Sequence, residues 1–398
     1  MQKHTPFHSR TAALCESQSW VEWSGYMSAQ MYEMDHIHEY NAIRLSAGLF
    51  DVSPLHKYSI RGRDAVALMN RVITRDASGC RVGQALYTAW CDDDGKIIDD
   101  GIVACLSENS FRMSTATPTL YWLQDNAFGM DVEIEDVSDA FGALALQGPT
   151  SRDILQRLTD ADMGDLEYFH LLETRLDTIP VTIMRTGYTG DLGYEVVAEP
   201  DHCERIWDAL METGADYKML PAGMVALDMA RIEAGLLLLD ADFHSASDAM
   251  FEVEKTSPYE LGLGWMVNQK KEHFVGQEAL RREQACGPAS CTVGLEVDLL
   301  ALEKVFARYS MPLQLPFQSW VDAVPVYSDG KQRDHIGRAT SGTWSPIIKK
   351  YVVIARVKPQ YAKLATRIYL EQTVEARRFA VPATVVKMPF FDPPRKRQ

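Results

Sequence analysis

Two adjacent carboxylates follow an apolar stretch of the chain: Asp99 and Asp100 come after Ile97 and Ile98 and precede Gly101. Side chains of a β-strand alternate between its two faces, so one carboxylate points toward an apolar face and its neighbour points away. Burying an unpaired carboxylate is costly, which makes an inward one a candidate for acid or base chemistry. The alternative is that both residues simply end a strand at the edge of its sheet.

The segment 85–105 predicts the β-hairpin that positions this pair. Two strand-like runs flank the turn-rich residues 92–95, which are typical of a hairpin loop. If the loop consists of these four residues, the register places Tyr87 directly across from Asp100. The two side chains then line one site.

Three glycines spaced three residues apart punctuate the segment 185–195, which also carries Tyr188 and Glu195. Glycines let the backbone come close to a flat ligand or to a neighbouring strand. The segment lacks the Lys-Ser/Thr ending of a phosphate loop. By itself the pattern also fits a glycine-punctuated hairpin with a purely structural role.

The segment Asp35–Glu39 contains two histidines, His36 and His38, between carboxylates. On a helix, side chains two positions apart point in different directions, whereas helical zinc sites use positions i and i+4. On a strand the two histidines share a face. We expect a solvated helix face here, and no metal cofactor is predicted.

Composition restricts the class of protein and its partners. A chain of 398 residues with 46% hydrophobic residues is typical of a globular protein with two or three domains. Its net charge of -15 repels phosphate backbones, so we expect no nucleic-acid partner. The basic cluster 395–397 is expected to be a frayed, solvated terminus.

Cysteine usage and hydropathy indicate the compartment. The seven cysteines include no Cys-x-x-Cys pair, which favours free thiols in a reducing environment. The N-terminal residues lack the apolar core of a signal peptide, and no stretch approaches the roughly 20 apolar residues that span a bilayer. We therefore expect a cytoplasmic protein with no membrane association.

The remaining pattern predicts helices first and a β-rich unit last. Helix-like spacing covers residues 30–50 and much of 200–240. Composition shifts near residue 285, beyond which strand-like runs separated by turns predict a small all-β barrel or sandwich.

Several short motifs follow one another over nearly the whole chain. They are residues 48–53, 83–87, 95–100, 146–149, 185–195, 221–223, 231–234, 258–267 and 274–280. In this order and spacing the chain resembles the T-protein (aminomethyltransferase) family of the glycine cleavage system.

The resemblance implies an α+β, three-domain cloverleaf around a central hole that holds folate, with a C-terminal β-barrel domain. The implied folate-binding region is 1–284, with the barrel at 285–398. Within that region the resemblance implies two interleaved α+β domains, roughly 1–53 with 138–240 and 54–137 with 241–284.

The same resemblance assigns roles to individual residues. Asp100 corresponds to the carboxylate beside N5 of the pterin, and we take Asp100 and Tyr87 as the catalytic residues. Glu195 corresponds to the carboxylate that grips the guanidine-like edge of the pterin, a role suited to an acceptor of two parallel N–H bonds. Tyr87 and Tyr188 correspond to aromatic residues that line the tetrahydrofolate cavity.

Departures from the family pattern concern the donor side and the folate tail. Leu55 and Thr115 replace family residues of the cavity and are candidate substrate-binding residues. Leu227 stands where the family has a folate-contacting arginine, and Arg395 or Arg397 is a candidate substitute that binds the cofactor.

The N-terminal aromatic region also departs from the family pattern. Tyr26 and Met31, with Trp20 and Trp23, are candidates to line a pocket for the one-carbon donor. Ordinary core packing is the alternative for these four side chains.

Three functions follow from the resemblance. The leading hypothesis is a tetrahydrofolate-dependent demethylase that moves a methyl group from an O-, N- or S-methyl small molecule to N5. The alternative is aminomethyl transfer from a lipoyl carrier protein with release of ammonia. A non-enzymatic folate-binding role is third, because relatives with that role carry a cysteine motif that residues 272–278 lack.

Overall fold

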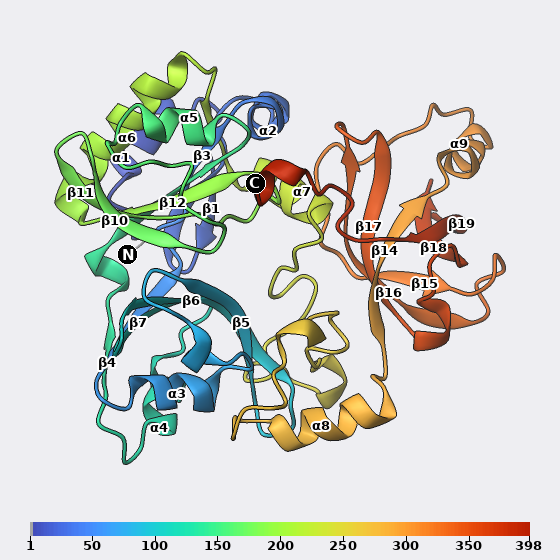
Figure 1. Cartoon of the computed structure of the whole chain (residues 1–398). Helices are drawn as coiled ribbons and strands as arrows, with labels where there is room; N and C mark the ends of the chain where they lie inside the picture. The colour runs from blue at the N-terminus through green and yellow to red at the C-terminus, as the bar shows by residue number, and fades with distance from the viewer. Residues whose placement is uncertain (1–2) are drawn as a thin grey trace.

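The structure, a computed structural model, describes residues 3–398 and consists of three lobes, each built on its own β-sheet (Figure 1). The first lobe holds a mixed six-stranded sheet, the second a five-stranded antiparallel sheet, and the third a closed six-stranded barrel. The predicted α+β class with a C-terminal barrel is therefore confirmed. Within the described residues, no helix combines the length and apolar character needed to cross a bilayer.

The first lobe has the strand order β10-β11-β12-β9-β3-β13 and an N-terminal hairpin, β1-β2. Its strands are β1 (Ser19–Trp23), β2 (Tyr26–Met31), β3 (Gly48–Asp51), β9 (Gly142–Gln147), β10 (Leu171–Leu176), β11 (Ile179–Met184), β12 (Gly193–Ala198) and β13 (Leu220–Pro221). Its helices are α1 (His8–Leu14), α2 (Ile37–Leu45), α5 (Ser151–Gln156), α6 (Pro200–Ala215) and α7 (Met224–Glu233). Helix α6 begins with a proline and buries Ile206, Trp207 and Leu210 on one face, as the apolar spacing predicts.

The second lobe has the strand order β5-β6-β7-β4-β8. Its strands are β4 (His56–Arg61), β5 (Ala85–Cys91), β6 (Ile97–Ser107), β7 (Ser110–Thr115) and β8 (Glu133–Asp136). Helices α3 (Ala65–Val72) and α4 (Leu120–Asn126) pack on one face of this sheet, in a core that includes Leu68, Trp90 and Met113. Helix α8 (Gln277–Cys286) also belongs to this lobe. The opposite face of the sheet is turned toward the first lobe (Figure 1).

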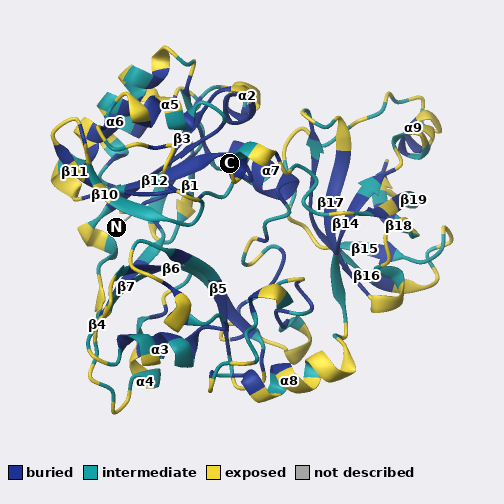
Figure 2. Ribbon diagram, in the orientation of Figure 1, coloured by how far each residue is buried: buried dark blue, intermediate teal, exposed yellow. Residues whose placement is uncertain are grey.

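The third lobe is a barrel in which β14 pairs with both β17 and β19. Its elements are β14 (Cys291–Val297), α9 (Leu299–Ala307), β15 (Val324–Tyr327), β16 (His335–Ser345), β17 (Lys350–Val357), β18 (Arg367–Val374) and β19 (Arg377–Val386). Alternate residues of β17, namely Val353, Ala355 and Val357, fill the barrel interior. Figure 2 shows the buried residues concentrated in the sheets and the exposed ones on outer helices and loops.

Short 3-10 turns connect these elements. They are η1 (Ala77–Gly79), η2 (Ser138–Ala140), η3 (Glu252–Glu254), η4 (Gly264–Met266), η5 (Pro359–Tyr361) and η6 (Pro394–Lys396). The helix expected over residues 30–50 is shorter than predicted. Met31 ends a strand and the helix begins at Ile37, because Met31 belongs to the β1-β2 hairpin.

The solvated helix face predicted for Asp35–Glu39 is wrong for two of its residues. His36 is 1% exposed and its ring centroid lies 4.8 Å from that of Phe317, which belongs to the third lobe. Glu39 is also buried, and its carboxylate is satisfied there by hydrogen bonds from backbone N–H groups, including that of Gly223 at 2.7 Å. No group of three or more metal-ligating side chains suited to hold a metal ion occurs among residues 3–398.

The basic tail is ordered, so the prediction of a frayed terminus is wrong. Arg395 donates two hydrogen bonds to the carboxylate of Asp191, at 2.6 and 2.8 Å. The carbonyl of Gln398 accepts hydrogen bonds from the guanidinium groups of Arg152 and Arg185. These charge-assisted contacts hold the tail against the glycine-rich segment of the first lobe, where Figure 1 places the C-terminus.

Candidate active site

Strands β5 and β6 form the hairpin that carries Asp100, and its register differs from the predicted one. Tyr87 pairs with Ile102, and Asp100 pairs with Ala89. The prediction that Tyr87 lies directly across from Asp100 is wrong for two reasons. Cys91 pairs with Ile97, so the loop has one residue more than predicted, and a bulge beside Trp90 adds a second residue to the offset. The offset is two residues, so both side chains keep the same face, and the Tyr87 hydroxyl donates to the Asp100 carboxylate diagonally across the hairpin.

The two adjacent carboxylates have different environments. Asp99 is fully buried and accepts hydrogen bonds from the backbone N–H groups of Ala116 (3.1 Å) and Thr117 (2.9 Å) and from the Thr117 hydroxyl (2.8 Å). Asp100 is partly exposed and accepts the Tyr87 hydroxyl. Burial raises the pKa of both carboxyl groups, and the neighbouring charge of Asp100 raises the pKa of Asp99 further. Asp99 therefore ties β6 to the segment after β7, and Asp100 is the carboxylate available to a ligand.

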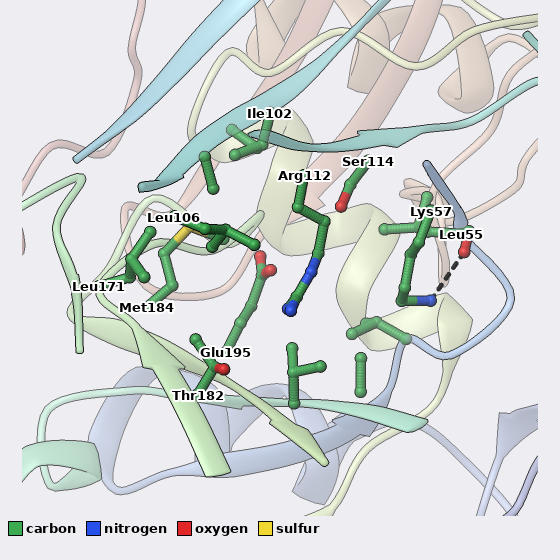
Figure 3. Close-up of a pocket in the computed structure, with 14 residues that line it drawn as sticks. Leu55, Lys57, Ile102, Leu106, Arg112, Ser114, Leu171, Thr182, Met184 and Glu195 are labelled. Atoms are coloured by element: carbon green, nitrogen blue, oxygen red, sulfur yellow. Dashed lines mark hydrogen bonds between the residues drawn. The ribbon is translucent and has the colours of Figure 1, made fainter. Parts of the chain in front are cut away.

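A cavity lies between the sheet of the first lobe and the sheet of the second (Figure 3). Its empty space of about 540 Å³ includes a part that is open to solvent. Its apolar wall consists of Val52, Leu55, Ile102, Ala104, Leu106, Ala143, Leu171, Met184 and Val197. Because alternate residues of a strand share a face, Asp100 lies on the same face of β6 as Ile102 and Ala104. The cavity therefore adjoins Asp100.

Three charged side chains enter this apolar cavity: Lys57 from β4, Arg112 from β7 and Glu195 from β12. No hydrogen bond reaches the Glu195 carboxylate from residues 3–398; burial raises its pKa to about 7, and the charge of Lys57 opposes that rise. The Lys57 ammonium donates to the carbonyl groups of Ser53 (2.9 Å) and Leu55 (2.8 Å), and burial lowers its pKa to about 8. The unused lone pairs of Glu195 are available to a ligand that presents paired N–H donors.

Aromatic side chains gather around Tyr87. The ring of Trp265 lies 6.3 Å from the ring of Tyr87, and the Arg75 guanidinium lies 5.7 Å from the centre of the Trp265 ring. Tyr188 donates its hydroxyl to the carbonyl of Leu237, a residue of the apolar cluster against which Tyr87 packs. Burial raises the pKa of both tyrosines. The two tyrosines singled out by sequence thus lie in one aromatic region beside Asp100.

Sequence reasoning missed Lys57, Arg112 and Trp265. Arg112 stands between two apolar residues on a strand, and Lys57 stands between His56 and Tyr58; such a position is a signal of a charge facing a site or solvent. The sequence does not show which of these two environments applies, because that depends on what packs against the sheet. Trp265 lies within the motif 258–267 and is 63% exposed, which is unusual for so large an apolar ring.

The candidate substrate-binding residues are dispersed. Leu55 lines the cavity. Thr115 lies on the opposite face of β7 from the cavity-lining Ser114, and its hydroxyl donates to the carbonyl of Thr117 at 2.7 Å. Tyr26 lies on the β1-β2 hairpin and donates its hydroxyl to the carboxylate of Asp139.

The other N-terminal candidates contribute to structure rather than to this cavity. Met31 ends strand β2, and its carbonyl accepts the Ser17 hydroxyl at 2.6 Å. Trp20 packs against the core of the first lobe, and Trp23 packs against a second apolar cluster that includes Leu227. The donor pocket expected around these side chains is therefore not formed by the cavity beside Asp100.

The two tail arginines proposed as folate ligands already have carboxylate partners. Arg395 is paired with Asp191, and Arg397 lies 2.9 Å from Asp392. Arg112, by contrast, has neither an ion pair nor a hydrogen bond to residues 3–398. Arg112 lines the cavity, whereas Arg395 and Arg397 do not.

Family models match most of the chain. The model described as the GCVT N-terminal domain matches residues 7–271, and the glycine cleavage T-protein C-terminal barrel domain matches residues 319–392. The chain belongs to the glycine cleavage T-protein family. Its T-protein fold agrees with a solved structure, the glycine cleavage system aminomethyltransferase T of Bartonella henselae, at a TM-score of 0.82 and 22% identity over 98% of this chain and 99% of that one.

Relatives of this T-protein family member include two kinds of enzyme. An aminomethyltransferase of Halothermothrix orenii is 32% identical over 93% of this chain and 95% of its own length. A trimethylamine-oxide aldolase of Ruegeria pomeroyi is 32% identical over 100% of this chain and 48% of its own length. The prediction of a one-carbon transferase is confirmed. Aminomethyltransferases of Clostridium botulinum, Desulfitobacterium hafniense and Geobacillus kaustophilus are further relatives, at 31–32% identity.

Proposed function

We propose that this protein transfers a one-carbon group to tetrahydrofolate, and that the group is an aminomethyl unit carried by a lipoyl carrier protein. The single observation that supports this most is the pairing of a partly exposed Asp100 with an adjoining cavity that contains an unpaired Glu195. The names of the relatives favour the aminomethyl group over a methyl group. Asp100, the carboxylate for the chemistry, thus belongs to the second lobe, and Glu195, the carboxylate for binding, belongs to the first.

The cavity suits a pterin ring. Its walls are apolar on both sides, so a flat ring is removed from water, and Glu195 projects between them (Figure 3). A carboxylate accepts two parallel N–H bonds from the 2-amino and ring N–H groups of a pterin, which sets the orientation of the ring. Lys57 helps to keep Glu195 ionised for this purpose.

Asp100 is suited to move a proton. Its raised pKa brings the carboxyl group closer to neutrality, where proton exchange is efficient. Tyr87 donates to one carboxylate oxygen, which orients the group and leaves its other oxygen for the reacting atoms. Tetrahydrofolate supplies the nucleophilic N5 that receives the carbon. N5 bonds to this carbon as its bond to the lipoyl sulfur breaks, and N10 bonds to it as the amine departs as ammonia, so the protons lost from N5 and N10 end on the thiol and on ammonia. Asp100 holds N5 in position and relays one of these protons.

A second candidate is transfer from a small methylated molecule. Two observations favour it: Leu227 stands where the resemblance expects a folate-contacting arginine, and the trimethylamine-oxide aldolase matches the whole of this chain. Leu55 in the cavity wall also departs from the family pattern. In this reaction Asp100 keeps its role and only the donor changes.

Mass analysis of the pterin product distinguishes the two. The protein is incubated anaerobically with tetrahydrofolate and either an aminomethylated lipoyl carrier protein or a set of O-, N- and S-methylated small molecules. Formation of 5,10-methylenetetrahydrofolate and ammonia from the carrier supports the proposal. Formation of 5-methyltetrahydrofolate from a small molecule supports the second candidate, and no folate product from either donor set contradicts both.

A further inference from the structure

Arg112 is an unpaired cation inside the cavity. It lies on β7 opposite Ala104 of β6, and its side chain points into the space between the two sheets (Figure 3). Its guanidinium lies 4.6 Å from the centre of the Phe141 ring but makes no ion pair or hydrogen bond with residues 3–398. Burial lowers the pKa of this arginine. Arg112 is partly buried, and the charge of Glu173 acts on it without a hydrogen bond between the two side chains. Its five N–H donors therefore have no acceptor among residues 3–398, and a ligand in the cavity can supply one.

Arg112 and Glu195 lie on opposite walls of the cavity and have complementary hydrogen-bonding groups. Figure 3 shows the two side chains entering the cavity from opposite sides, Arg112 from the second lobe and Glu195 from the first. One offers only donors and the other, when ionised, only acceptors. The two do not form an ion pair with each other. A flat ligand with donors at one edge and an acceptor near by satisfies both side chains at once.

Lys57 does not compete for the same acceptor. Its ammonium already donates to two backbone carbonyl groups, those of Ser53 and Leu55. Ser114, the remaining polar residue of the β7 wall, is a hydroxyl that both donates and accepts and so imposes no polarity on the ligand. Arg112 is therefore the charged side chain of this cavity whose N–H groups have no acceptor among residues 3–398.

We propose that Arg112 recognises the 4-oxo oxygen of the pterin, while Glu195 accepts hydrogen bonds from the 2-amino and N3–H groups of the same ring. This inference rests on the proposed function, and it makes Arg112 a specificity-determining residue. A 4-amino pteridine presents a donor where the 4-oxo ring presents an acceptor, and its N3 carries no hydrogen for Glu195. The effect of Arg112 is therefore read from the change that each ligand shows between variants, and not from the affinities of the two ligands for one protein. Arg112 thus selects for the 4-oxo ring, because a guanidinium cannot accept a hydrogen bond.

Equilibrium binding of two ligands to four proteins tests the inference. The ligands are tetrahydrofolate and its 4-amino analogue in the same reduction state. The proteins are the unaltered chain, Arg112→Met, Arg112→Lys and the control Arg61→Met, an exposed arginine on the neighbouring strand β4. Circular dichroism and thermal unfolding of each protein establish that the fold is retained.

Arg112→Met is expected to weaken tetrahydrofolate binding roughly 10- to 100-fold, the loss of one hydrogen bond to a charged group. Binding of the 4-amino analogue stays within about twofold, since that ligand offers Arg112 no acceptor. Arg112→Lys, which keeps a donor, recovers part of the lost affinity, and Arg61→Met binds both ligands normally. This pattern is not produced by a packing role on Phe141, which affects both ligands alike.

Two results overturn the inference. Equal weakening of both ligands, or unchanged tetrahydrofolate binding in Arg112→Met, shows that Arg112 does not recognise the 4-oxo group, while the proposed function stands. Failure of the unaltered protein to bind tetrahydrofolate removes the proposed function as well. If the analogue binds no protein measurably, Arg112→Lys decides, because no recovery of tetrahydrofolate affinity in that variant contradicts the inference.

Discussion

Tyr87 and Asp100 are hydrogen-bonded diagonally across the β5-β6 hairpin, although neither is the cross-strand partner of the other. A five-residue loop between Cys91 and Ile97 and the bulge beside Trp90 together produce this offset. Asp99, the next residue, points to the other face and is fully hydrogen-bonded to the segment after β7. One hairpin therefore supplies both a structural carboxylate and a reactive one.

Asp100→Asn is expected to lower kcat by roughly 10² to 10⁴, because it removes the acid/base group and keeps its shape. Tetrahydrofolate binding stays largely intact, since Glu195 lies in the adjoining cavity and contacts the other end of the ring. Steady-state kinetics and equilibrium binding measure the two effects separately. If the variant is as active as the unaltered protein, the assignment of Asp100 as the acid/base group is wrong.

Asp99→Asn is the matched control for that variant. One oxygen of the Asp99 carboxylate accepts the three hydrogen bonds from Ala116 and Thr117, and the other accepts the backbone N–H of Asp100 at 2.8 Å. An amide has one acceptor oxygen, so it cannot keep both sets. We expect a loss of unfolding free energy of roughly 1–3 kcal/mol, measured by chemical denaturation. A stable Asp99→Asn variant contradicts the structural role given to Asp99.

Tetrahydrofolate affinity is expected to depend on pH through Glu195. The pKa of Glu195 is raised to about 7, and the ionised form accepts the pterin N–H groups, so binding weakens as the pH falls below about 7. Measuring the dissociation constant of tetrahydrofolate between about pH 5.5 and 9 tests this pH dependence. Glu195→Gln, which does not titrate, binds weakly at every pH. A pH-independent affinity in the unaltered protein argues against Glu195 as the pterin ligand.

Lys57→Met is expected to move that pH dependence upward. The Lys57 charge opposes the rise in the pKa of Glu195, so its removal raises that pKa further and leaves the carboxyl group protonated at neutral pH. Affinity is lost at pH 7 and recovered at more alkaline pH. The midpoint of the affinity curve is the measurement, and the same midpoint in both proteins shows that Lys57 does not act on Glu195.

Glu195→Gln is also expected to change stability in a pH-dependent way. The folded-state pKa of Glu195 lies above its unfolded value, so the native state binds the extra proton and stability falls as the pH rises from about 4.5 through about 7. Removing the charge therefore stabilises the protein at pH 8 and has little effect near pH 5. Thermal unfolding at both pH values tests this, and equal shifts at the two values contradict it.

Deletion of residues 395–398 is expected to lower stability more than tetrahydrofolate affinity. The Asp191 carboxylate is buried and loses its two hydrogen bonds from Arg395, a cost of roughly 1–3 kcal/mol. Chemical denaturation measures the loss, and Arg397→Gln, which removes only the pair with Asp392, is the milder control. A large drop in tetrahydrofolate affinity at unchanged stability would restore the tail arginines as folate ligands.

Local signals in the sequence determined the elements. Alternation of apolar residues and turn residues predicted the hairpin that bears Asp100 and the strands of the barrel, because a strand and its turn are set by residues near one another in the chain. Apolar spacing likewise predicted the buried face of α6. The motif order indicated the family, and the matching family models confirmed it.

Only the tertiary structure decided which charges meet. Glu195 stands on β12 of one lobe, while Lys57 and Arg112 stand on β4 and β7 of another, and the cavity exists because the two sheets face each other. The docking of Arg395 on Asp191 and the offset between Tyr87 and Asp100 likewise depend on packing and on one bulge. Strand periodicity states that alternate side chains share a face, but the surroundings of that face are set by contacts between residues far apart in the chain.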